Sequence, residues 1–147
     1  MLLMRENNYK TIYSIWNRNP IFNIELKQII DEYTPGDNFA LCSLKTPPNP
    51  PILPPKSISG HKLPFFTLSS SKILSSSHSE ITSKISKIKS KCSILPSEEL
   101  KIICICQYGS KSKSVSEYLR INGINSAYLF GGIKDFSPLV GPHFWLK

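Results

Sequence analysis

A cysteine followed by a short polar loop is the feature of this chain best suited to chemistry. Cys106 follows the apolar run 102–105 and opens the segment Cys-Gln-Tyr-Gly-Ser-Lys-Ser. The residues after this segment can form an amphipathic helix, so the cysteine would lie between a strand and a helix. Backbone N–H groups in such a loop, and the N-terminus of the helix, favour an anion. We therefore predict that Cys106 reacts as a thiolate with a sulfur- or phosphorus-bearing anion.

The loop residues have separate predicted roles around this nucleophile. Gly109 allows the loop to curl so that its amides converge. Lys111 adds a positive charge that would bind an anionic substrate. Ser112 either caps the following helix or assists the chemistry, and the sequence leaves both roles open. The predicted substrate-binding residues are Gln107, Tyr108, Gly109, Ser110, Lys111 and Ser112.

The other three cysteines have simpler predicted roles. Cys104 shares strand parity with Cys106 but lies inside the apolar run, so it is expected in the core rather than as a resolving thiol. Cys42 also lies in an apolar run, and Cys92 is expected to be a loop thiol. The chain contains no CxxC pair and no His/Cys grouping with zinc-ligand spacing. The sequence therefore predicts no metal site and no cofactor.

Size and charge limit the functions that this chain can have. Its 147 residues, 40% of them hydrophobic, suit one domain with a single core. The formal net charge of +8 favours an acidic protein surface, RNA or an anionic small substrate as partner. The basic residues are scattered and are not grouped with aromatic residues at a recognisable spacing. A solvated lysine-rich surface is therefore predicted, without direct nucleic-acid binding.

The start of the chain carries no recognisable targeting signal. Residues 1–4 are apolar, but Arg5 and Glu6 follow at once, which does not fit a secretory signal. No apolar run approaches membrane-spanning length. We therefore expect a cytoplasmic protein without membrane contact, in a reducing compartment where the thiols stay free.

The chain divides into two predicted parts. Residues 1–21 are polar and mixed, and they predict an N-terminal arm or a short helix. Residues 22–147 predict a single domain. Apolar residues at helical spacing over 26–33 predict its first helix, and the apolar run 39–44 predicts a buried first strand.

Two low-complexity segments interrupt this domain. Residues 46–56 are proline-rich and cannot form a helix or an interior strand, so a polyproline or irregular loop is expected. Residues 69–79 are serine-rich and predict a mobile segment. The apolar segment 63–68 between them is consistent with a second strand.

The second half of the domain alternates between strands and helices. Isoleucines at helical spacing over 81–88 predict a helix capped by Ser79. The strand over 101–106 follows, then a helix that stops at Asn122-Gly123, then a strand over 127–130. This alternation predicts an α/β fold with a mainly parallel sheet covered by helices on both faces.

Residues 102–136 closely resemble the C-terminal half of rhodanese-like domains. In that family a catalytic cysteine follows an apolar strand, and a glycine, often a basic residue, a serine and a helix come next. After the helix come a glycine, a strand, and a Gly-Gly-apolar turn that ends in an aromatic residue. The matching residues here are Cys106, Gly109, Lys111, Ser112, Gly123, Tyr128, Leu129, Phe130, Gly131, Gly132, Ile133 and Phe136.

The first half matches the family less closely. The helix near 25–30 resembles the opening helix of the family. Ser43 and Lys45 stand where a strand ending in Asp-x-Arg is usual. The segment 59–64, which includes His61, matches a Gly-His-apolar-Pro turn, and His61 is expected to be structural. The resemblance covers about residues 22–147 and implies a five-stranded, mainly parallel sheet flanked by helices.

A finer resemblance is to the rhodanese domain of ubiquitin-like-protein activating enzymes that also serve as molybdopterin synthase sulfurylases. Their catalytic loop shares the Cys, Tyr, Gly and Ser found here over 106–112. The tail 141–147 also resembles theirs. This resemblance implies a sulfur-transfer domain that stands apart from any adenylating domain.

The resemblance implies a sulfurtransferase in which Cys106 carries sulfane sulfur as a persulfide. The sulfur donor would be thiosulfate or a desulfurase persulfide. The acceptor would be a thiol, cyanide or a ubiquitin-like sulfur carrier protein, with tRNA thiolation or molybdopterin synthesis as the implied pathways. The substrate-binding role of the loop residues and the absence of a cofactor agree with this activity.

Two other functions remain open at the level of sequence. The first is a catalytically silent rhodanese-like module that binds a protein partner, which the substitutions Ser43 and Lys45 favour. The second is a phosphatase of the related cell-cycle type. That chemistry needs an arginine six residues after the cysteine to hold phosphate oxygens. Ser112 occupies this position and Lys113 is one residue too far, so the loop favours sulfur over phosphate.

Overall fold

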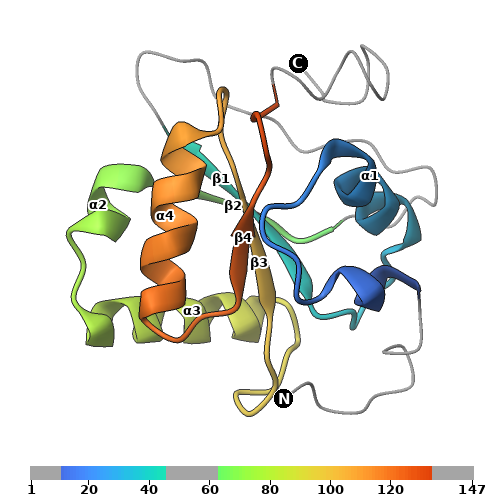
Figure 1. The fold of residues 1–147 in the computed structure, drawn as a ribbon. Helices are drawn as coiled ribbons and strands as arrows, with labels where there is room; N and C mark the ends of the chain where they lie inside the picture. The colour runs from blue at the N-terminus through green and yellow to red at the C-terminus, as the bar shows by residue number, and fades with distance from the viewer. Residues whose placement is uncertain (1–10, 46–62, 134–147) are drawn as a thin grey trace.

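The computed structural model describes residues 11–45 and 63–133, which form a parallel β-sheet between two helical layers (Figure 1). Helices α2, α3 and α4 cover one face of the sheet, and η2 and α1 cover the other. The elements in chain order are η2 (Thr11–Ile15), α1 (Asn23–Glu32), β1 (Phe39–Lys45), β2 (Phe65–Ser69), α2 (Ser70–Leu74), α3 (His78–Lys91), β3 (Lys101–Ile105), α4 (Ser110–Ile121) and β4 (Ser126–Tyr128).

The sheet places the strand that leads to Cys106 in its interior. The strand order is β2-β1-β3-β4, and every neighbouring pair is parallel. All five residues of β3 are buried, as expected for a strand covered on both faces. The α/β class, the parallel sheet and the flanking helices predicted from the sequence are therefore confirmed.

The described sheet has four strands, so the expectation of five is wrong for this part of the chain. Next to β4, Ile21 makes a single parallel bridge with Leu129. Its N–H donates to Tyr128 O at 2.8 Å, and its carbonyl accepts from Phe130 N at 2.9 Å. Helix α1 begins at Asn23, only two residues later, so the chain leaves this bridge for the helix before a strand can extend in that direction.

Residues 11–21, predicted as part of an N-terminal arm, pack into the core. Ile12, Ile15 and Trp16 are buried in the apolar cluster beneath α1. The Trp16 ring meets the Phe39 ring edge-on, with 5.5 Å between their centroids. This segment therefore stabilises one face of the sheet and also forms one wall of a cavity described below.

The serine-rich segment 69–79 is helical over much of its length, which corrects the expectation of a mobile segment. Its serines act as helix caps. Ser69 caps α2 by accepting a hydrogen bond from Lys72 N. Ser77, rather than Ser79, caps α3 in a capping box with Glu80. The predicted apolar face of this helix is confirmed by the burial of Ile81, Ile85 and Ile88.

Some predicted features lie outside the described residues. They are the proline-rich loop 46–56, the turn with His61, and the tail that begins at Lys134. Within the described ranges, no helix combines the length and the apolar character needed to cross a membrane.

Candidate active site

Cys106 lies directly after the carboxyl end of β3, where the chain turns into α4. Ligands of open parallel sheets bind outside these carboxyl ends, because the loops there face a common space. Cys106 is only 2% exposed, so its thiol is shielded from bulk solvent. The strand-loop-helix arrangement predicted around this cysteine is confirmed.

The loop directs hydrogen bonds at the sulfur of Cys106. The N–H of Gly109 donates to Sγ with an N···S distance of 3.1 Å, and the N–H of Ser112 donates at 3.4 Å. The hydroxyl oxygen of Ser112 lies 3.3 Å from Sγ and donates its own proton to Gly109 O at 3.0 Å. Hydrogen bonds from N–H groups stabilise a thiolate more than a thiol.

Gly109 is the residue that makes this convergence possible. Its φ is 95°, in the left-handed region where a side chain is disfavoured. It occupies the N-cap position of α4 and turns its N–H towards Sγ. The sequence left Ser112 as a cap or as a partner of the cysteine. The structure places it inside the first turn of α4, completely buried, and bonded to the sulfur.

A second loop, distant in sequence, supports the first. The carbonyl of Cys106 accepts a hydrogen bond from Ile133 N at 3.0 Å. A Cβ atom on Gly109 would lie 3.1 Å from Gly132 N, and one on Gly132 would lie 2.7 Å from Cys106 O. The two backbones are therefore in contact because both positions lack side chains.

The glycines at 131 and 132 were predicted only as a turn after the last strand. They do form a turn, with φ of 77° and 71°. Their contact with the Cys106 loop was not predicted. The two consecutive glycines were the sequence signal that could have indicated this contact. A turn with one left-handed residue needs only one glycine, so the second one points to a close approach of another backbone.

The remaining loop residues face outwards to different degrees. Tyr108 is 59% exposed, Ser110 and Lys111 are exposed, and Gln107 is half-buried. Lys111 lies in the first turn of α4, next to the loop that holds the thiol. The substrate-binding roles of these residues, including the predicted contact of Lys111 with an anion, remain predictions.

The other three cysteines have thiols whose pKa is raised, so they stay protonated near neutral pH. Cys42 and Cys104 pair in register on β1 and β3. Burial raises the pKa of Cys42 to about 12, and burial followed by the neighbouring Cys42 raises the pKa of Cys104 well above its usual value. Cys92 was expected in a loop, but it ends α3 and packs in the core. Burial raises its pKa to about 11, so its thiol also stays protonated near neutral pH.

Ser43 and Lys45, which stand at the end of β1 in place of the Asp and Arg usual in the family, have different surroundings. Ser43 is buried, 1% exposed, and pairs in register with Ile105 of β3. Lys45 is exposed at the end of the strand.

Among the described residues, no group of three or more His, Cys, Asp or Glu side chains could hold a metal ion.

Replacement of Ser112 by alanine is expected to slow the reaction of Cys106 with a sulfur donor by about tenfold, because a hydrogen-bond partner of the sulfur is lost. Ser114→Ala is the matched control, since the Ser114 hydroxyl bonds only its own helix, at Ser110 O. Single-turnover loading measured by mass spectrometry compares the two variants. Equal rates in Ser112→Ala and the parent protein would show that the Ser112 hydroxyl does not assist the reaction, which would leave only its backbone N–H at the sulfur.

Comparison with solved structures identifies the fold. A rhodanese-related protein from Thermoplasma volcanium superposes with a TM-score of 0.50 at 15% identity, covering 85% of this chain and 96% of that one. A Rhodopseudomonas palustris protein of unknown function, described as a possible tyrosine phosphatase, has a TM-score of 0.51 at 11% identity, with coverages of 95% and 98%. A single-domain sulfurtransferase from Saccharomyces cerevisiae has a TM-score of 0.49 at 14% identity, with coverages of 86% and 94%.

The similarity to the Thermoplasma volcanium protein indicates a rhodanese-like α/β fold. No protein-family model and no curated protein matches the sequence. Because the identities are low, the similarity extends to the fold, and any activity must be argued from the residues around Cys106.

Proposed function

We propose that this protein is a rhodanese-type sulfurtransferase in which Cys106 is the nucleophile. The observation that carries the proposal is the convergence of the Gly109 and Ser112 N–H groups on Sγ. N–H groups that hydrogen-bond Sγ stabilise the negative charge of the attacking thiolate, and they do so again when sulfur transfer releases Cys106 as thiolate. The three other cysteines lack such a loop and are protonated by burial, so they offer no competing nucleophile.

The proposed reaction has two steps at this sulfur. In the first, the Cys106 thiolate attacks the outer sulfur of thiosulfate, a new S–S bond forms, and sulfite leaves with the electron pair of the bond that breaks. A desulfurase persulfide would donate in the same way, with a thiolate as leaving group. In the second, an acceptor thiolate or cyanide attacks the terminal sulfur and releases Cys106 as thiolate.

Ser112 can follow the change of charge during these steps. In the thiol state its hydroxyl accepts from Cys106 and donates to Gly109 O. Once the sulfur is ionised, rotation of the same hydroxyl allows it to donate to Sγ instead. Lys111 would attract the anionic donor to the outer side of the loop.

The composition of the loop supports sulfur rather than phosphate as the transferred group. A phosphatase of the related type needs a guanidinium that holds phosphate oxygens in a bidentate arrangement. Ser112 stands at that position with its hydroxyl turned into the loop, and Lys113 is exposed on α4. The donor, the acceptor and the pathway follow only from the family resemblance, with a ubiquitin-like sulfur carrier, tRNA thiolation and molybdopterin synthesis as candidates.

A catalytically silent binding module is the second candidate. The burial of Cys106 and the exchange of the usual Asp-x-Arg for Ser43 and Lys45 favour it. Such a module would keep the fold and the loop without transferring sulfur. The two candidates differ in a property that is directly measurable.

Incubation with thiosulfate is expected to add the mass of one sulfur atom to the protein, on the peptide that contains Cys106, and a reductant should remove it. A Cys106→Ala variant should take up no sulfur, because the other thiols are protonated in the core. Cys92→Ala is the matched control and should load as the parent protein does. If neither thiosulfate nor a small persulfide donor modifies Cys106 in the folded protein, the silent module is the better description.

A further inference from the structure

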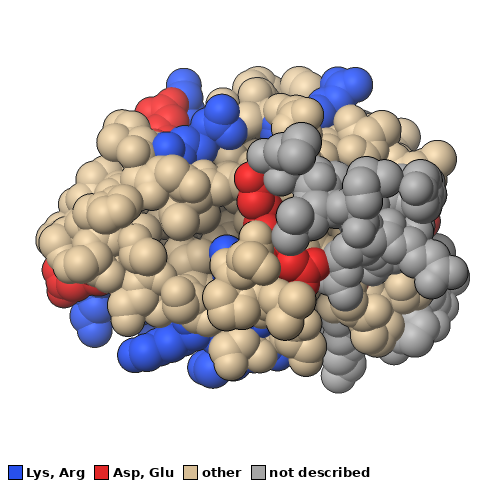
Figure 2. Space-filling model, turned by 90° about the horizontal axis from the view of Figure 1, so that it is seen from below, with Lys and Arg blue, Asp and Glu red and all other residues tan. Residues whose placement is uncertain are grey.

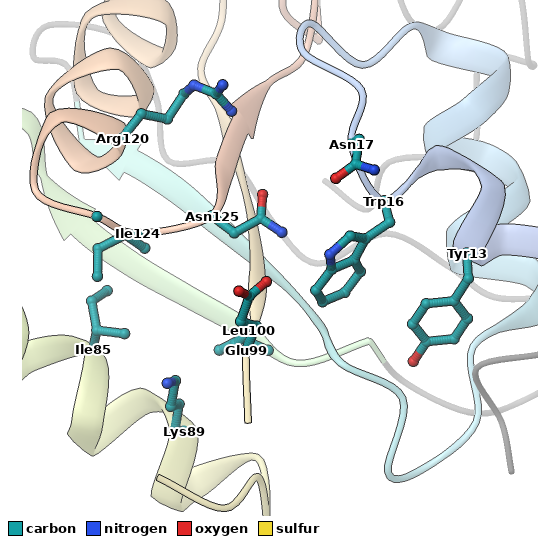
Figure 3. A pocket seen from close by; sticks show the side chains of 11 residues that line it. Tyr13, Trp16, Asn17, Ile85, Lys89, Glu99, Leu100, Arg120, Ile124 and Asn125 are labelled. Atoms are coloured by element: carbon teal, nitrogen blue, oxygen red, sulfur yellow. The ribbon is translucent and has the colours of Figure 1, made fainter. Parts of the chain in front are cut away.

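A cavity of about 850 Å³ lies at the opposite end of the sheet from Cys106. Its walls include Leu100 and Asn125, which directly precede β3 and β4, so it lies at the amino ends of these strands. Residues following η2 and residues of α3 and α4 complete the walls (Figure 3). The volume is within the usual range for small-molecule pockets, about 300–1,000 Å³.

The cavity combines an apolar part with charged groups. Trp16 and Ile124 line it together with Leu100. The charged residues that line it are Lys89, Glu99 and Arg120. Figure 2, which views the molecule from below, shows basic side chains mostly along the margins of this end, with acidic side chains both near its centre and at its left margin.

A buried lysine lies behind the cavity wall. Lys101, the first residue of β3, is 0% exposed. Its ammonium donates to Arg18 O at 2.9 Å and to Asn125 Oδ1 at 3.3 Å, both of which are neutral acceptors. Within the described residues, it pairs with no carboxylate. Burial, and then the nearby charge of Arg120, lower the pKa of Lys101 to about 8, so two cations lie close together here.

This lysine determines which atoms Asn125 presents to the cavity. Because Oδ1 of Asn125 accepts from Lys101, the side-chain NH₂ group is the part left to donate to a ligand. Arg120 uses one of its guanidinium N–H groups on Ser126 O at 3.1 Å. Its other N–H groups are available to a ligand, since a guanidinium has five. Figure 3 shows Asn125 between Arg120 and Trp16, with Ile124 on the side opposite Trp16.

We propose that this cavity binds a small organic oxyanion, with its anionic group against Arg120 and Asn125 and an apolar or planar body against Trp16 and Ile124. An anion placed there offsets the repulsion between Arg120 and the buried Lys101. Glu99, also on the cavity wall, disfavours a second anionic group on the ligand. The site shares no residue with the Cys106 loop, so it is independent of the proposed sulfur transfer.

The test is an NMR titration of the ¹⁵N-labelled protein with phenyl phosphate. The side-chain amide of Asn125 and the indole N–H of Trp16 should shift in a saturable way with one affinity. Inorganic phosphate, which lacks the planar body, and phenol, which lacks the anion, should each bind at least about tenfold more weakly. Absence of saturable shifts at these two signals in the parent protein would overturn the proposal.

Variants that remove one positive charge test whether phenyl phosphate binds in this cavity. Arg120→Gln should weaken phenyl phosphate binding by about tenfold or more. Lys113→Gln removes the same charge from an exposed position on the same helix and should leave the affinity unchanged. Equal losses in both variants would mean attraction by surface charge alone and would refute the site.

Two further variants locate the ligand independently of Arg120. If Arg120→Gln does not fold, Asn125→Asp replaces the donating NH₂ group by an anion and should also weaken binding; unchanged affinity there would contradict the proposal. Cys106→Ala should bind phenyl phosphate as the parent protein does. A loss of binding in Cys106→Ala would place the ligand at the sulfur loop instead.

Discussion

Gly132→Ala is expected to slow sulfur loading of Cys106 by about a hundredfold, although residue 132 lies far from the nucleophile in sequence. A Cβ atom at this position would lie 2.7 Å from Cys106 O and 2.6 Å from the carbonyl carbon of Gln107. These are backbone atoms of the Cys106 loop, so they cannot move aside without moving the loop. The N–H groups of Gly109 and Ser112 would then no longer converge on Sγ.

The substitution should also lower the free energy of unfolding, by about 2–4 kcal/mol. Part of this cost is the steric overlap, and part is the strain of an alanine at φ 71°. Gly123→Ala is the matched control, because Gly123 has φ 82° but a Cβ atom there would meet no other atom within 4 Å. It carries the strain alone, about 1–2 kcal/mol, and should load sulfur at the rate of the parent protein.

Urea unfolding and single-turnover loading, measured on both glycine variants, separate stability from site geometry. Loading must be compared at a temperature where both variants are folded. A Gly132→Ala protein that is folded and loads sulfur as fast as Gly123→Ala would show that the second loop does not position the nucleophile.

Lys101→Met is expected to change how stability depends on pH. The pKa of Lys101 falls from its usual 10.5 to about 8 in the folded protein, mainly because the ammonium is buried. Below pH 8 the lysine is charged in both states, and the full penalty of burying the charge applies, up to about 3 kcal/mol. This penalty is absent from the methionine variant.

The sign of the pH dependence follows from the protons bound. Between pH 8 and 10.5 the unfolded chain holds the Lys101 proton while the folded chain has released it. Raising the pH therefore stabilises the folded state of the parent protein through this group. Relative to Lys101→Met, the parent protein should gain about 2–3 kcal/mol in the free energy of unfolding between pH 7 and pH 10.

Other groups act in the opposite direction but cancel in this comparison. Burial raises the pKa of Tyr33 to about 12 and those of the three core thiols, so these groups favour the unfolded state as the pH rises. They are present in both proteins. Lys113→Met, at an exposed position, should keep the pH dependence of the parent protein. A Lys101→Met protein that also keeps it would show that the Lys101 ammonium is not buried at a cost.

Much of the fold could be predicted from local patterns. Apolar spacing identified α1 and α3, and continuous apolar runs identified β1 and β3. These signals are local, because the periodicity of burial is repeated within each element. The serine-rich segment misled the prediction, since serines favour both loops and helix caps, and only the hydrogen bonds of Ser69 and Ser77 decide between them.

The number of strands could not be predicted in this way. The resemblance to rhodanese-like domains implied a fifth strand. In the described part of the chain, only Ile21 pairs at this edge of the sheet, through a single bridge to Leu129. The short distance from Ile21 to the start of α1 limits its length. The length of a strand at this position depends on where β4 and α1 meet in space. A resemblance to a family motif gives no information about it.

The sequence by itself identified Cys106 and its loop as the candidate site, because the hydrogen bonds to Sγ come from Gly109 and Ser112, within six positions of Cys106. Tertiary structure alone decided what supports and surrounds this loop. Gly132 and Ile133 reach Cys106 only because β4 lies parallel to β3. Lys101 meets Arg18 across 83 positions of the chain. Contacts of this kind arise when packing of the sheet and helices brings distant backbones together, and no local pattern of residue types records them.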